Sequence, residues 1–172
     1  TTTTSIDGLV LYHPIIQIWS GTVQIHRDED LAAATANLPP SALVSDGRKR
    51  LVPKDPLRPL RRVRKNVDTL LRRHGFRMMG GIAVPESATG QIEVELPKLQ
   101  TAFQDSLNEL CLNLEDWYQK LEAEYPQWVP MLRKSRLTPQ DVRARCRFDV
   151  VAIRAAAPNP SIAPQASLRF SR

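Results

Sequence analysis

The sequence predicts an α+β fold, in which a small antiparallel sheet of about three strands packs against a basic amphipathic helix and a long helix. Three separated segments rich in β-branched and aromatic residues predict the strands, and two segments with apolar residues at helical spacing predict the helices. Fourteen prolines against seven glycines, clustered between these segments, indicate Pro-rich loops. The sequence pattern alone does not give the order in the sheet of strands that lie so far apart in the sequence. A mainly helical protein therefore remains the alternative.

The predicted strands are residues 8–20, 76–84 and 148–153. Pro14 lacks the N–H for one ladder bond, so the first segment is expected at a sheet edge or with a bulge. Gly80 and Gly81 interrupt the second segment and indicate a bulge or a close approach of two backbones. Between the first two strands, residues 27–56 form a long excursion punctuated by prolines, with a short helix expected at 28–36.

Residues 57–74 predict a helix with one apolar and one basic face. Pro56 lies near its start, and Gly75 suits its end. At about 100° per residue, one face holds Leu60, Val63, Val67, Leu70 and Leu71. The opposite face carries Arg58, Arg61, Arg62, Lys65, Arg72 and Arg73. Because the apolar face belongs in a core, the basic stripe is expected to be held rigidly rather than to lie on a disordered tail.

The longest predicted helix covers residues 98–123, with Pro97 in its first turn and a further helical segment at 91–96 before it. Its apolar residues recur at spacings of three and four: Leu99, Phe103, Leu107, Leu110, Leu114, Trp117 and Leu121. This seam suits packing within the fold, and it also suits contact with a second copy, so an oligomer stays open as an alternative.

Thr138, followed by Pro139 and Asp141, predicts the cap of a later helix. Residues 1–154 are expected to form a single globular domain and 155–172 a flexible C-terminal tail.

Charge is distributed unevenly along the chain, although the net charge of +6 is modest. Residues 48–77 contain twelve of the 24 Lys and Arg residues and only two acids, Asp55 and Asp68. Residues 86–124 contain nine acids against Lys98 and Lys120. The acidic segment therefore competes with external anions for the basic one, either within one chain or between two copies.

The basic helix is the strongest chemical signal, because guanidinium groups form bidentate, charge-assisted bonds to phosphate or carboxylate. The candidate nucleic-acid-binding residues are Arg58, Arg61, Arg62, Lys65, Arg72, Arg73 and Arg77. The candidate partner-binding residues form a second basic patch, namely Arg143, Arg145 and Arg147. Trp19, Phe76 and Trp128 offer stacking surfaces, although aromatic side chains more often belong to a core.

Motifs of common enzyme classes are missing from the sequence. Gly80-Gly81 matches neither of the glycine-rich phosphate-binding patterns, and no Gly-x-Ser-x-Gly nucleophile motif occurs. The three histidines, His13, His26 and His74, have no metal-ligand spacing. We therefore expect no catalytic residue, no metal and no cofactor. An enzyme of unfamiliar type, using the Gly80-Gly81 loop with Arg77 and His74, is the remaining alternative.

The cysteines and the hydropathy pattern indicate the cellular compartment in which the protein is expected. Cys111 and Cys146 are far apart and lie among apolar neighbours, which favours buried thiols in a reducing cytoplasm over a disulfide framework. No apolar run approaches the ~20 residues that a membrane helix needs, so no membrane partner is expected.

Three segments together resemble a bacterial and phage family known only as domain-of-unknown-function family 3150. They are Ile18-Trp19-Ser20-Gly21 with the following Asp28-Glu29-Asp30-Leu31, the run from Gly75 to Glu86, and the long helix ending near Trp117 with Tyr125-Pro126-Gln127-Trp128 after it. The resemblance spans residues 6–154. It implies a component of a mobile-element or phage gene cluster, encoded near a ring-forming AAA+ ATPase and a von Willebrand A-type protein, and it implies no catalytic residue.

The function predicted from these observations is that of a non-catalytic, nucleic-acid-binding accessory subunit of a larger bacterial or mobile-element complex. The Arg-rich helix at 57–74 would contact the phosphate backbone, in DNA or in RNA. The alternative is a protein–protein adaptor that docks on an AAA+ ATPase or another assembly without touching nucleic acid.

Overall fold

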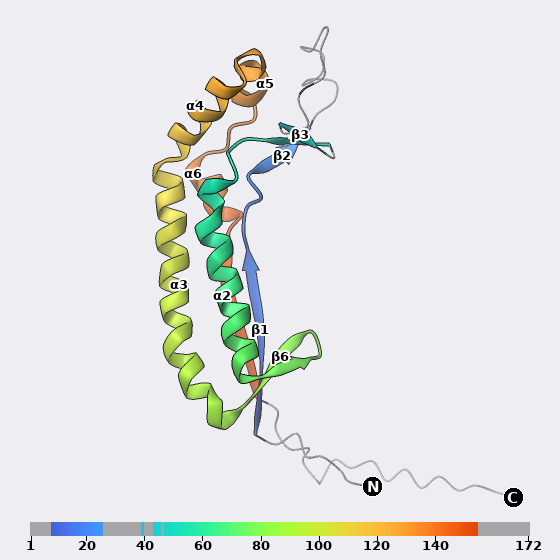
Figure 1. The fold of residues 1–172 in the computed structure, drawn as a ribbon, viewed down its shortest axis with the longest axis vertical. Coiled ribbons are helices and arrows are strands. Elements are labelled where there is room, and N and C mark those ends of the chain that lie inside the picture. The colour runs from blue at the N-terminus through green and yellow to red at the C-terminus, as the bar shows by residue number, and fades with distance from the viewer. Residues whose placement is uncertain (1–7, 26–38, 40–42, 46, 155–172) are drawn as a thin grey trace, which may run out of the picture.

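The computed structural model describes residues 8–25, 39, 43–45 and 47–154, and it confirms the α+β class (Figure 1). A four-stranded antiparallel sheet has the order β5-β6-β1-β7, and a three-stranded sheet has the order β2-β4-β3. The strands of the larger sheet are β1 (Leu9–Gln17), β5 (Phe76–Met78), β6 (Gly81–Pro85) and β7 (Arg147–Arg154). Those of the smaller sheet are β2 (Thr22–Gln24), β3 (Val44–Ser45) and β4 (Arg48–Arg50). The helices are α2 (Arg58–His74), α3 (Thr89–Leu112), α4 (Leu114–Glu124), α5 (Val129–Arg133) and α6 (Pro139–Ala144). The helix expected at 28–36 and the tail expected at 155–172 lie outside the described residues.

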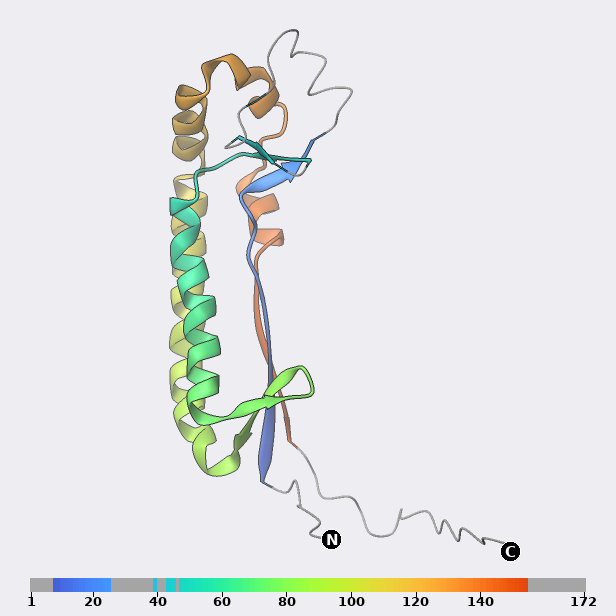
Figure 2. The same cartoon turned by 45° about the vertical axis from the view of Figure 1, so that its right-hand side comes forward.

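The two long helices, α2 and α3, run side by side along one face of the larger sheet (Figures 1 and 2). Alternation along the strands turns Val10 and Tyr12 of β1 toward the helices, together with Ile82 and Val84 of β6. From α2, Val67 and Leu71 meet them, so the basic helix is part of the core, as its periodicity predicts. Further along α2, Leu60 and Val63 join a larger apolar cluster with α3 and the following helices. Leu60, Val63, Val67 and Leu71 form the apolar edge of α2. Burial of this edge fixes the rotation of α2 about its own axis.

The place of Pro14 in the sheet corrects one expectation. β1 is a central strand rather than an edge strand, because it pairs with both β6 and β7. However, β6 pairs only with Leu9–Tyr12, whereas β7 continues alongside β1 as far as Gln17. Pro14 therefore lies where β1 has a neighbour on one side only, which is a local edge where a missing N–H is tolerated.

Residues 76–84 form a hairpin and not one bulged strand. β5 and β6 pair through Met78 and Gly81, which leaves Met79 and Gly80 as a two-residue turn. Both turn residues have positive φ, 46° and 75°, as the primed hairpin turns require. The expected close approach of backbones does occur at Gly81, where a Cβ would come within 2.7 Å of the Tyr12 carbonyl oxygen.

The long helical segment is longer than predicted and is broken in two. Pro97 lies inside α3 rather than in its first turn, because the segment at 91–96 is continuous with it. Asn113 separates α3 from α4, and its side-chain amide donates to the Glu109 carbonyl at 2.9 Å. The apolar seam packs within the fold: Phe103, Leu107, Leu110, Leu114 and Leu121 are buried, and Leu99 and Trp117 are partly buried. The seam is therefore used for packing within one chain.

The helices after α3 return the chain to the sheet. Glu122 of α4 is buried and accepts hydrogen bonds from Arg133 at 3.1 Å and Arg136 at 2.6 Å. Thr138 caps α6 as predicted, in a capping box with Asp141. The hydrogen bonds from Thr138 lower the pKa of the Asp141 carboxyl. Together these contacts place the start of β7 beside β1.

We predict that Gly75, which joins α2 to β5, does not tolerate alanine. Its backbone is extended, so the requirement is steric: an added Cβ would fall on the carbonyl oxygen of Ala83. Gly75→Ala should lower the free energy of unfolding in urea by about 3 kcal/mol, since a backbone atom has no alternative rotamer. Gly90→Ala is the matched control, because an added Cβ there meets nothing within 4 Å. In α3 it should raise stability by up to about 1 kcal/mol. Equal effects at the two positions would contradict this account.

Candidate nucleic-acid interface

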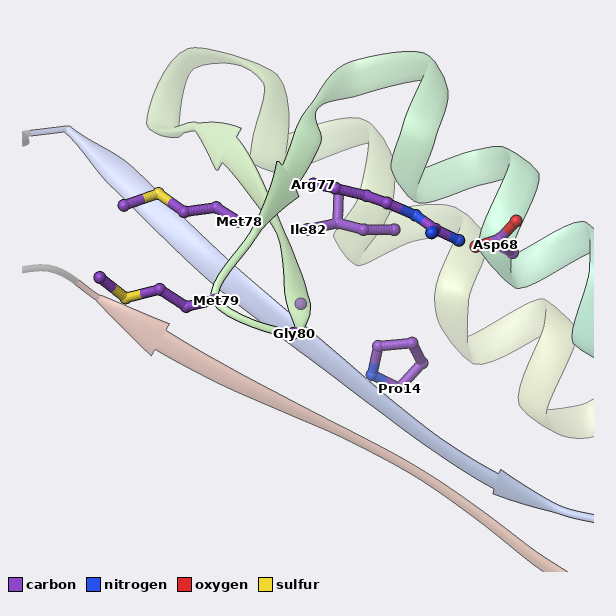
Figure 3. Close-up of a pocket in the computed structure, with 8 residues that line it drawn as sticks. Pro14, Asp68, Arg77, Met78, Met79, Gly80 and Ile82 are labelled. Atoms are coloured by element: carbon purple, nitrogen blue, oxygen red, sulfur yellow. The ribbon is translucent and has the colours of Figure 1, made fainter.

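A groove runs between α2 and the sheet, and basic side chains dominate its lining. Its larger part has a volume of about 550 Å³ and is lined by Pro14, Ile16, Arg61, Arg64, Lys65, Asp68, Arg72 and Arg77. An adjoining part of about 390 Å³ reaches the β5–β6 hairpin and shares Pro14, Asp68 and Arg77 (Figure 3). The two parts together form the basic groove.

One wall of the basic groove is a stripe along α2. Arg61, Lys65 and Arg72 lie at positions i, i+4 and i+11, so they share one side of the helix. Arg64 widens the stripe on the side next to the buried Leu60 and Val67. From Arg61 to Arg72 the stripe covers about 16 Å, a length over which one strand of B-DNA carries about five phosphates.

Arg77 reaches the groove from the sheet. It pairs with Ile82 across the β5–β6 hairpin, and this register turns its side chain to the helix-covered side. Figure 3 shows Arg77 extending toward Asp68 of α2, whereas Met78 and Met79 point the other way. The single-residue connection at Gly75 brings β5 back so soon after α2 that the two elements converge on the same groove.

The floor of the basic groove is apolar. Pro14 and Ile16 belong to β1 and lie beyond the end of its pairing with β6, so no strand covers them on that side. The groove thus offers cations at its walls and a nonpolar base, a combination that suits a ligand with a charged backbone and flat, less polar groups.

Asp68 is the one acid among the residues that line the groove. Its carboxylate accepts from Arg72 Nε at 2.9 Å, an i,i+4 pair whose two side chains are both about half exposed. Exposed ion pairs of this kind contribute little to the free energy of unfolding. The main effect of the Asp68–Arg72 pair is therefore on the electrostatic potential in the groove. The pair neutralises one of the five lining cations and leaves four without a carboxylate in the groove.

The structure brings together four of the seven predicted nucleic-acid-binding residues: Arg61, Lys65, Arg72 and Arg77. The other three lie elsewhere. Arg58 pairs with Asp55 at 2.9 Å at the start of α2, Arg73 lines smaller cavities beside Glu95 of α3, and Arg62 is exposed outside the groove. The prediction missed Arg64, although its position four residues after Leu60 places it at the margin of the apolar face.

The second predicted patch is spread over the start of β7 and the helix before it. Arg143 of α6 donates to Asn108 Oδ1 of α3 at 2.6 Å, and Arg147 pairs with Asp149 at 2.8 Å along β7. Arg145 is exposed at the end of α6. The three arginines do not converge on a shared cavity among those that the described residues form.

The residues of the enzyme alternative are only partly brought together. Arg77, Gly80 and Gly81 line one cavity, whereas His74 lines a different one between α2 and α3. Burial raises the pKa values of the Cys111 and Cys146 thiols, which disfavours their thiolate forms. Among the described residues, no three His, Cys, Asp or Glu side chains cluster as metal ligands would.

The acidic segment does not cover the basic stripe. Glu115 and Glu122 are engaged by Arg136, Glu95 by Lys98, and Glu86 lies 4.0 Å from Arg154. In the part of the chain that the structure describes, no ion pair joins α2 to α3. Among the described residues, the acidic segment therefore leaves the cations of the basic groove unpaired with it.

Fold and groove define a small α+β protein with a cationic groove between a helix and an antiparallel sheet. The chain belongs to the family described as Protein of unknown function (DUF3150), whose model matches residues 6–169. This confirms the family resemblance seen in the sequence. No curated protein and no solved structure is significantly similar to the chain. None of the described helices is both long and apolar enough to span a membrane.

We predict that Asp68→Asn tightens binding of polyanions to the basic groove. The substitution removes the carboxylate that partly neutralises the groove and keeps the side chain's size. Affinity for a single-stranded oligonucleotide at low salt should rise roughly two- to fivefold, the size of one exposed charge interaction. Fluorescence anisotropy measures it. Asp55→Asn, which removes the exposed carboxylate paired with Arg58 outside the groove, is the control and should change affinity less. A weaker complex with Asp68→Asn would contradict a cationic binding role.

Proposed function

We propose that this protein is a non-catalytic accessory subunit that binds the nucleic-acid backbone in its basic groove. The observation that carries the proposal is the convergence of five cationic side chains, from α2 and β5, on one groove with a single acid in it. The complex to which this subunit belongs is a bacterial or mobile-element one, as the resemblance noted in the sequence implies.

The groove's shape favours backbone contact over a small-molecule site. Its cations follow one helix edge over three turns instead of surrounding a closed chamber, so they match a linear array of charges. Arginine supplies four of the five cations, and its planar fork suits phosphate oxygens. The apolar floor at Pro14 and Ile16 favours single-stranded over duplex nucleic acid, because only unpaired bases can turn their faces toward it.

An acidic protein surface is the second candidate for the same cations. Carboxylates also form bidentate bonds with arginine, and an adaptor for an AAA+ ATPase would need such a contact. The observation favouring nucleic acid is that every described residue of α2 that lines the groove is charged, since protein interfaces centre on aromatic and aliphatic residues. Reciprocal competition separates the two candidates: for a nucleic-acid site, a single-stranded oligonucleotide should displace labelled polyglutamate at a lower concentration than polyglutamate displaces the labelled oligonucleotide, and the reverse order favours an acidic protein.

We predict that Arg61→Glu with Lys65→Glu abolishes most nucleic-acid binding. Two phosphate contacts are lost and two repulsions are added, so affinity should fall at least about a hundredfold near 50 mM salt. For the wild type, log affinity should fall linearly with log salt, and the slope should become shallower by about 1.4 for single strands when two contacts are removed. Fluorescence anisotropy across a salt series gives both quantities.

The matched control for this pair is Arg62→Glu with Arg145→Glu. It makes the same change in net charge at exposed positions outside the groove, so affinity should fall less than about fivefold through the long-range field alone. Circular dichroism of each variant checks the fold. If both double variants lose affinity equally, binding is non-specific attraction to a basic protein. If the wild type binds no oligonucleotide at low salt, the proposed function is wrong.

A further inference from the structure

The tip of the β5–β6 hairpin exposes an apolar side chain next to the basic groove. Met79 is 78% exposed, and among the large hydrophobic residues of the described chain only Leu112 is more exposed, at 82%. Met79 lines the hairpin end of the groove together with Gly80 and the cation Arg77 (Figure 3). Leu112 lies at the end of α3 and lines neither part of the groove. The hairpin therefore places a solvent-exposed thioether beside the cations.

The backbone conformation of Met79 is unfavourable for its residue type. Its φ of 46° lies in the left-handed region, and no other described non-glycine residue has a positive φ. Asn, Asp and Gly are preferred at both positions of such a hairpin turn, so Gly80 follows the preference and Met79 does not. Burial of the side chain does not offset this strain, since Met79 is exposed. A strained residue that packs against nothing in the fold indicates a contact outside it.

The glycines beside Met79 hold the hairpin tip against β1 and leave space at the turn. At Gly81 an added Cβ would come within 2.7 Å of the Tyr12 carbonyl oxygen and 2.9 Å of His13 Cε1, so glycine permits the close approach of β6 to β1. At Gly80 an added Cβ would meet nothing within 4 Å. The tip is therefore anchored at Gly81 and open at Gly80.

Arg77 and Met79 lie on opposite sides of this tip. Figure 3 shows Arg77 extended toward Asp68 in the groove, whereas Met79 points away from Asp68. Two residues of extended chain cover about 7 Å, roughly the length that two nucleotides of one B-form strand cover. A strand whose phosphates contact the groove as far as Arg77 can therefore pass the bare backbone of Gly80 and bring a base next to Met79.

The chemistry of methionine suits contact with an unpaired base. Its side chain is unbranched and polarisable, and thioethers pack favourably against flat rings. Apolar side chains, methionine among them, also insert between bases in proteins that bind nucleic acid. From the exposure, the strained turn and the adjoining groove, we infer that Met79 packs against an unpaired base of a single strand bound in the basic groove. The inference rests on the proposed function and extends it, because the protein then recognises bases as well as phosphates.

A base contact at Met79 separates single-stranded nucleic acid from other polyanions. Polyphosphate and acidic polypeptides offer negative charges to the groove, but polyphosphate has no ring and glutamate side chains have none either. In a duplex the faces of the bases are covered by their neighbours, so Met79 reaches them only where the strand is unpaired.

The test compares two oligonucleotides of about ten nucleotides, which is longer than the roughly five phosphates that span the groove. One is oligothymidylate, and the other has the same phosphates with an abasic sugar at every position. Met79→Asn in the full-length protein should weaken binding to oligothymidylate about three- to tenfold, the size of one thioether–ring contact. It should change binding to the abasic strand less than about twofold, because the phosphates are the same. Fluorescence anisotropy at low salt measures the affinities.

Two further variants separate the contact from stability. Asn-Gly is a preferred pair in a hairpin turn with two positive φ angles, so the urea midpoint of Met79→Asn should be no lower than that of the wild type. Met79→Leu keeps an apolar side chain at the tip and should retain most of the affinity for oligothymidylate. Leu112→Asn is the matched control, since it replaces a similarly exposed apolar residue outside the groove, and it should leave both affinities unchanged.

Three results decide between the inference and the proposed function. If Met79→Asn binds oligothymidylate as tightly as the wild type, the inference is wrong. It is also wrong if the variant loses affinity equally for both strands, since Met79 would then act on the shape of the groove. In either case the proposed function stands if Arg61→Glu with Lys65→Glu abolishes binding to both strands. A wild type that binds neither strand overturns the proposed function, and the inference with it.

Discussion

Burial of one edge of α2 is the constraint on which the rest of the structure depends. Val67 and Leu71 close the core over the sheet, while Leu60 and Val63 close it over α3. At roughly 1.5–3 kcal/mol for each buried aliphatic side chain, the helix cannot rotate without losing a large part of the protein's stability. Its cations are therefore carried at a fixed angle to the sheet. A weakly packed basic helix would present the same charges in many orientations and pay an ordering entropy on binding.

The second constraint is the short return from α2 to β5. Gly75 permits β5 to begin immediately after the helix, because the missing Cβ leaves room for the Ala83 carbonyl. This return sets Arg77 opposite Asp68 and closes one end of the groove. The same hairpin turns Phe76 to the opposite side of the sheet. Because side chains alternate along β5, Phe76 and Arg77 point to opposite sides of the sheet. One of these sides is apolar and the other is cationic.

The sequence predicts elements that depend on local periodicity and caps, and it misses features that depend on pairing. The basic helix, the strand segments and the Thr138 cap follow from spacings within one segment, and the structure confirms them. The division of 76–84 into two strands depends on the positive φ of Met79, a residue type that gives no turn signal. The continuity of α3 through Pro97 is a case of tertiary packing overriding propensity, because Phe103 and its neighbours anchor the helix beyond the proline. Helical periodicity alone groups Arg73 with the groove arginines, because the sequence of α2 does not show on which side the sheet lies.

The distribution of charge over the two sides of the sheet links these surfaces physically. One side carries helices, and its margin exposes cations that repel other copies of the chain; the other side is neutral and apolar. Water penalises exposure of the apolar side whatever the salt concentration, whereas the cationic side weakens as salt rises. The two surfaces therefore differ in their response to ionic strength: added salt screens the cationic side, both in its repulsion of other copies and in its attraction to phosphate, and leaves the apolar side unaffected. Any attraction to a polyanion therefore depends on the cationic side and weakens as salt rises, whereas the apolar side keeps its character.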